Sequence, residues 1–150
     1  MADIAALAQE FDRWGMAAVI DGFPAQIEVA LGAGMPEMPR GPFDKVVAAG
    51  MGGSASPMDV VSDAFRDRIL VPVEVTRHYC PPAGVGARTL AIVSSFSGNT
   101  EEAISSLCEL SKLTPNVVVL AGGGALAESA GDRPLVRIPT DREPPGFQPR

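Results

Sequence analysis

The pattern that most constrains the fold is a series of five short apolar runs, each ending in glycine or polar residues. They are Val46–Ala49, Val71–Val75, Leu90–Val93, Val117–Leu120 and Leu135–Ile138. Stretches able to form helices lie between them, at Pro57–Arg66, Glu101–Lys112 and Ala125–Ala130. Continuous apolar strands that alternate with amphipathic helices are typical of an α/β fold, a parallel sheet covered on both faces. Ligands of such sheets bind at the loops that follow the carboxyl ends of the strands.

Two further helices are predicted before the first of these runs. Apolar residues at helical spacing from Ile4 to Phe11 predict one helix, with Asp3 as its cap. Another begins near Pro24, which suits a first helical turn. Residues 141–150 show no helix or strand pattern. We therefore expect a single domain over residues 1–140 and a linker-like tail over residues 141–150.

Composition excludes several classes of protein. A chain of 150 residues with 46% hydrophobic and 20% charged residues is long enough for one globular core. No apolar run approaches 18 residues, and the net charge of -6 opposes binding to nucleic acid. We expect a cytoplasmic protein with neither membrane nor nucleic-acid partners. Cys80 and Cys108 are expected to be reduced thiols, with Cys108 in the core. The single histidine, His78, is expected to be a partly exposed edge residue that binds no metal.

A glycine-rich loop, Gly50-Met51-Gly52-Gly53-Ser54-Ala55, directly follows the first predicted strand. Its glycines would let the backbone approach a ligand, and Ser54 adds a hydroxyl. With Ser56 as cap and Pro57 as first helical residue, the next helix would direct free amides at an anion. The same hexamer fits the dinucleotide fingerprint G-x-G-x-x-A, with Glu74 at roughly the distance expected for a ribose contact. A tight turn without a ligand is the third explanation.

A second polar loop, residues 94–100, follows the strand predicted at Leu90–Val93 and has the sequence SSFSGNT. Its four hydroxyls and one glycine precede a helix N-terminus, an arrangement suited to a phosphate monoester. Helix capping by Asn99 or Thr100, with Glu102 completing a capping box, is the alternative. Capping needs only one residue, so the remaining hydroxyls favour phosphate. A dinucleotide would not use this loop, whereas a sugar phosphate would use both loops.

Together the two loops resemble those of the bifunctional phosphoglucose/phosphomannose isomerase family, which is built from sugar isomerase (SIS) domains. Supporting matches extend the resemblance along nearly the whole chain: Phe23-Pro24-Ala25-Gln26, the strand and turn Val73–Pro82, residues 122–127 and Gln148-Pro149-Arg150. It implies a three-layer sandwich with a five-stranded parallel sheet of flavodoxin-like or Rossmann-like topology. It also implies site residues: Ser54, Ser95, Ser97 and Thr100 on the substrate phosphate, the backbone of Gly52, Gly53 and Gly98 near the substrate, and Arg150 as a catalytic residue that stabilises an enediolate.

The reaction implied by the resemblance converts glucose 6-phosphate or mannose 6-phosphate to fructose 6-phosphate, without a metal or other cofactor. In the family, the proton-transferring glutamate and the ring-opening histidine belong to a second SIS domain. We therefore expect the isolated chain to bind hexose phosphate and to need a second SIS domain or a homodimer partner. A non-catalytic sugar-phosphate-binding or regulatory module is the first alternative, and an NAD(P)-binding Rossmann domain is the second.

Overall fold

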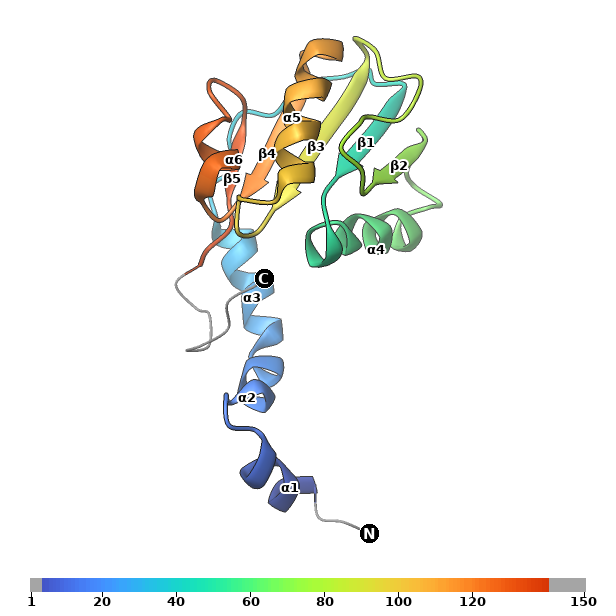
Figure 1. The fold of residues 1–150 in the computed structure, drawn as a ribbon. Helices are drawn as coiled ribbons and strands as arrows, with labels where there is room; N and C mark the ends of the chain where they lie inside the picture. The colour runs from blue at the N-terminus through green and yellow to red at the C-terminus, as the bar shows by residue number, and fades with distance from the viewer. Residues whose placement is uncertain (1–3, 141–150) are drawn as a thin grey trace. The chain divides into compact units, whose positions relative to one another are not determined.

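The computed structural model describes residues 4–140, which fall into two compact units. The smaller contains three helices, α1 (Ile4–Phe11), α2 (Met16–Asp21) and α3 (Phe23–Gly32). The larger, Met35–Pro139, contains a parallel sheet and its helices (Figure 1). None of the helices in the described residues is long and apolar enough to cross a membrane.

The helix α2 was not predicted from the sequence. Its first amides are bound by the Asp12 carboxylate, which accepts hydrogen bonds from Met16 N at 2.6 Å and Ala17 N at 2.8 Å. These bonds, that of Ala17 first, lower the pKa of Asp12 below its ordinary value. The predicted helices α1 and α3 are present, and Pro24 lies in the first turn of α3 as expected.

Five strands form the sheet of the larger unit: β1 (Lys45–Ala49), β2 (Val73–Thr76), β3 (Thr89–Ser95), β4 (Val117–Ala121) and β5 (Leu135–Arg137). Every pairing is parallel, and the strand order is β2-β1-β3-β4-β5. This is the flavodoxin-like order, in which the chain reverses its direction of travel at the β1–β3 pair. The predicted α/β class with a five-stranded parallel sheet is confirmed.

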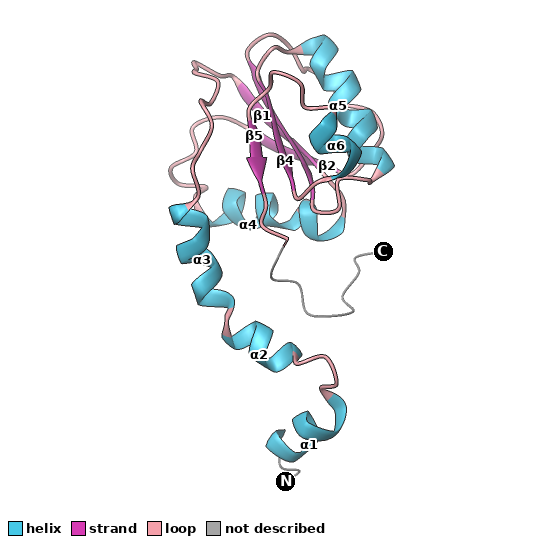
Figure 2. Ribbon diagram, turned by 90° about the vertical axis from the view of Figure 1, so that its left-hand side faces the viewer, coloured by secondary structure: helices cyan, strands magenta, loops and turns pink. Residues whose placement is uncertain are grey.

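Three helices connect the strands: α4 (Ser56–Ala64), α5 (Glu101–Leu113) and α6 (Gly124–Glu128). A short 3₁₀ helix, η1 (Gly52–Ser54), precedes α4. Figures 1 and 2 show α5 and α6 on the same face of the sheet. β2 begins two residues later than predicted, since Pro72 has no N–H to donate; its carbonyl still accepts from Val46 N at 2.9 Å.

The core lies between the sheet and the pair α5 and α6. Val47, Val93 and Val119 on the strands are fully buried, as are Leu110 on α5 and Leu126 on α6. The prediction that Cys108 belongs to this core is wrong, because its side chain is exposed. Residues 103, 107 and 110 are buried at spacings of four and three, which places position 108 about 100° away from that stripe.

Candidate functional site

The two predicted loops lie side by side at the carboxyl ends of β1 and β3. The first loop (residues 50–55) and the second loop (residues 94–100) are joined by a hydrogen bond of 3.1 Å from Phe96 N to Ser54 Oγ. Their approach is close: a Cβ added to Gly50 would lie 2.9 Å from the carbonyl oxygen of Ser94. The structure thus brings Ser54 to the second loop, although 42 residues separate it from Phe96.

Within the second loop, the hydroxyls differ in their exposure to a ligand. Ser95 is 1% exposed; its Oγ accepts from Gly98 N at 3.1 Å and lies 3.0 Å from Thr100 Oγ1. Ser97 is exposed and accepts a hydrogen bond from Asn99 N at 3.3 Å. Ser95 therefore stabilises the turn from inside, while Ser97 is exposed and Thr100 is half-buried with its hydroxyl beside that of Ser95.

The start of α5 has no side-chain cap. Thr100 occupies the N-cap position with extended backbone but makes no capping hydrogen bond. The Asn99 carboxamide oxygen instead accepts from Ala125 N, at 3.1 Å, in the neighbouring helix α6. The side chains of this loop therefore do not cap α5, so capping alone does not explain the loop. The first amides of this 13-residue helix keep the partial positive charge that attracts an anion.

A third loop, residues 122–124 at the junction of β4 and α6, packs closely against the second loop, with no room for a side chain at Gly98 or Gly124. A Cβ on Gly98 would lie 1.7 Å from Gly123 O, and one on Gly124 would lie 2.6 Å from Ser97 O. Leu126 N donates to Gly98 O at 2.8 Å. The three consecutive glycines after the strand are the sequence feature that could have predicted this packing. The sequence analysis used them only as part of the family resemblance.

The first loop leaves its glycine backbone open. A Cβ on either Gly52 or Gly53 would meet no atom within 4 Å, so a ligand can approach both residues. The predicted capping of α4 is wrong by one position, since the helix begins at Ser56 with Ala55 as its N-cap. The Ser56 hydroxyl donates to Gly52 O at 3.0 Å and so tightens the loop instead of capping an amide.

The position of Glu74 does not suit the dinucleotide alternative. Glu74 pairs in register with Val47, two residues before the end of β2 at Thr76. Its carboxylate lies 2.6 Å from Nζ of Lys45, the first residue of β1. A ribose contact needs an acidic group at the carboxyl end of the strand. Glu74 lies two residues before that end, a distance of about 7 Å along the strand.

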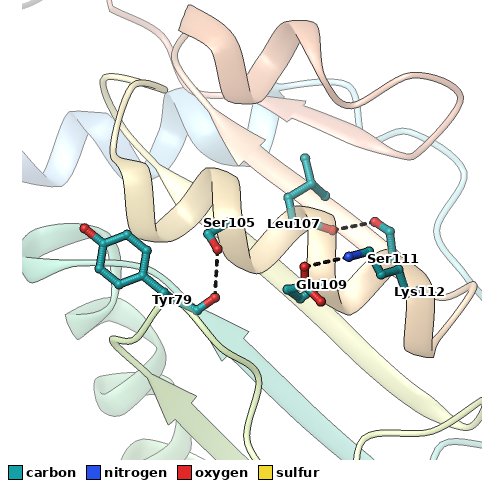
Figure 3. Close-up of polar contacts among 6 residues, drawn as sticks. All are labelled: Tyr79, Ser105, Leu107, Glu109, Ser111 and Lys112. Carbon is teal, nitrogen blue, oxygen red and sulfur yellow. Dashed lines mark hydrogen bonds and ion pairs between the residues drawn. The ribbon is translucent and has the colours of Figure 1, made fainter.

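A segment after β2 is bound to α5 close to the second loop. Ser106 Oγ donates to His78 O at 3.0 Å. Ser105 Oγ donates to Tyr79 O, also at 3.0 Å (Figure 3). The Tyr79 hydroxyl donates to Glu101 Oε2 at 3.3 Å. The negative charge of Glu102, then partial burial and the charge of Glu101, raise the pKa of Tyr79. Sequence reasoning did not find this contact, because it joins residues on separate elements.

The catalytic residue expected at the end of the chain, Arg150, lies outside the described residues. His78 and Cys80 are both exposed after β2. Among residues 4–140, no three His, Cys, Asp or Glu side chains are grouped so that they could hold a metal ion.

Comparison with known proteins identifies relatives over most of the chain, although no family model matches. The chain is 38% identical over 110 residues to a bifunctional phosphoglucose/phosphomannose isomerase from Caldicellulosiruptor bescii, covering 72% of this chain and 31% of that protein. Proteins of the same name from Thermoplasma volcanium and Thermoplasma acidophilum are each 36% identical over 110 residues, 73% of this chain and 33% and 32% of theirs. The chain thus spans about a third of the length of these relatives.

Among solved structures, a tagatose-6-phosphate ketose/aldose isomerase from Escherichia coli superimposes with a TM-score of 0.47 and 18% identity. The superposition covers 64% of this chain and 30% of that one.

Proposed function

Because this chain belongs to the bifunctional phosphoglucose/phosphomannose isomerase family over the third of a relative that it spans, we propose that it binds a hexose phosphate. The observation that supports this proposal is the uncapped start of α5 beside the hydroxyls of the exposed Ser97 and the half-buried Thr100. A phosphate dianion would accept hydrogen bonds from both the amides and the hydroxyls, and the helix dipole would favour its charge.

The proposed roles follow the exposure of each group. Ser97 and Thr100 donate to the phosphate directly, and Ser54 reaches it from the first loop. Ser95 acts from within, since its hydroxyl bonds Gly98 N and contacts Thr100. The open backbone at Gly52 and Gly53 gives the sugar room to approach β1. Phosphate binding thereby fixes the sugar ring over the β1–β3 switch point, where ligands of doubly wound sheets lie.

The reaction we propose is aldose-ketose isomerisation between glucose 6-phosphate or mannose 6-phosphate and fructose 6-phosphate. It requires ring opening, transfer of a proton between the two carbons beside the carbonyl, and stabilisation of an enediolate. This chain supplies the phosphate site, and the Arg150 guanidinium would stabilise the enediolate charge. The general base and the ring-opening acid come from a second domain.

A titration of the chain with glucose 6-phosphate and fructose 6-phosphate tests the binding site. We expect the Ser97→Ala/Thr100→Ala variant to bind at least about tenfold more weakly, because two charge-assisted hydrogen bonds are lost. Ser111→Ala is the matched control: it lies on the same helix, and its hydroxyl donates within the helix to Leu107 O at 2.6 Å (Figure 3). Unchanged affinity in the double variant would contradict the site, and binding of NAD in place of sugar phosphates would contradict the function.

We also propose that another subunit or SIS domain covers an apolar surface on and after α4. Val60 is 65% exposed, Phe65 is 45% exposed and Leu70 is 94% exposed. A surface with several large exposed apolar side chains is typical of a protein-protein interface. Two identical chains would meet there as a homodimer.

A further inference from the structure

The first residue of α5 presents a difficulty for a phosphate site. Glu101 directly follows Thr100, so its carboxylate is close enough in the chain to reach the amides that a phosphate would use. A carboxylate near a helix N-terminus is attracted to the same amides. It also repels a phosphate dianion at short range. A residue that holds this carboxylate away from the amides would therefore strengthen phosphate binding.

Tyr79 is placed to hold the Glu101 carboxylate in this way. Its hydroxyl donates to Glu101 Oε2 at 3.3 Å, and its backbone is held to α5 by the Ser105 hydroxyl. Figure 3 shows the ring extending from this anchored backbone away from Ser105, toward the N-terminal end of α5. The bond from Ser106, which is 1% exposed, to His78 O fixes the preceding residue as well. The backbone that carries the Tyr79 ring is thus fixed to α5 at two successive residues.

We propose that Tyr79 is a positioning residue that holds the Glu101 carboxylate away from the phosphate-binding amides of α5. This inference rests on the proposed function. The hydroxyl stays protonated at neutral pH, because the charges of Glu102 and Glu101 both disfavour the tyrosinate and so raise the pKa of Tyr79. Tyr79 therefore remains a hydrogen-bond donor at neutral pH, where a glutamate side chain carries its charge.

The test is a double-mutant cycle on the full chain with the variants Tyr79→Phe, Glu101→Gln and Tyr79→Phe/Glu101→Gln. Phenylalanine keeps the ring and removes only the hydroxyl. We expect Tyr79→Phe to weaken binding of fructose 6-phosphate and of inorganic phosphate by about 3- to 10-fold, because the freed carboxylate competes for the amides. In the double variant, which has no carboxylate to position, affinity should return to at least the wild-type value.

Rescue by Glu101→Gln is the readout that a merely structural tyrosine would not produce. Glu109→Gln is the matched control, since Glu109 lies near the other end of α5 and pairs with Lys112 at 2.6 Å (Figure 3). It should not rescue Tyr79→Phe. The inference is overturned if Tyr79→Phe binds like the wild type, or if the double variant binds as weakly as Tyr79→Phe. A wild type that binds neither probe would instead overturn the proposed function, and this inference with it.

Discussion

Replacing Gly98 with alanine should destabilise the protein strongly, because two loops meet at this residue. The Cβ of Gly98→Ala would lie 1.7 Å from the carbonyl oxygen of Gly123, about half the distance of an ordinary contact. That oxygen belongs to backbone, which cannot rotate away as a side chain could. Gly98 also has φ of 72°, a left-handed conformation that alanine adopts only with strain.

The two effects can be added to give a magnitude. The left-handed conformation costs a residue other than glycine about 1–2 kcal/mol. Forcing an extra carbon into a packed site costs roughly 1–3 kcal/mol. The free energy of unfolding should therefore fall by about 2–5 kcal/mol, and Tm by about 6–15 °C for a chain of this length.

Thermal unfolding followed by circular dichroism measures this change. Gly53→Ala is the matched control: Gly53 has no positive φ, and a Cβ there would meet no atom within 4 Å. Its free energy of unfolding should stay within about 0.5 kcal/mol of the wild type. A Tm for Gly98→Ala within about 2 °C of the wild type would refute the close packing of the second and third loops.

Two further predictions concern other parts of the chain. Because amides of Ala17 and Met16 lower the pKa of Asp12 in the folded state, the stability that Asp12 gives α2 is present above pH 3.8, its ordinary value. That stability is lost as the pH falls through the lower folded-state pKa, so Cα chemical shifts of α2 should move toward coil values there; shifts unaffected by acid would contradict the cap. Sedimentation at micromolar concentration should show a homodimer that Val60→Ser/Phe65→Ser dissociates, and a monomeric wild type would refute this.

The sequence predicted those elements whose identity depends on local pattern. All five strands are found because buried parallel strands are continuously apolar, and α5 begins at Glu101 as expected. The strand order depends on pairings between distant segments, and the family resemblance implied only a flavodoxin-like or Rossmann-like topology without choosing between them. The helix α2 was missed because a carboxylate four residues upstream, Asp12, caps it where the N-cap position itself is occupied by Gly15.

The candidate site was predicted in its composition but not in its internal contacts. Consecutive hydroxyls and glycines after strands indicated which residues gather at the carboxyl edge of the sheet. The sequence could not show that Ser95 turns inward, because that depends on how Gly98 folds back toward it. Nor could it show that Asn99 caps α6 and leaves α5 uncapped, since the acceptor and Ala125 N are 26 residues apart.

The hydrogen bond between Phe96 N and Ser54 Oγ has a consequence for how the protein reaches its native state. It spans 42 residues and exists only after β1 has paired with β3. Parallel pairing over such a separation forms slowly, because the entropy of closing the intervening chain is lost before the contacts form. A chain with only β3, α5 and β4 in place would have the second loop without the first. Ligand affinity during refolding should therefore appear late, as a report on the assembly of the centre of the sheet.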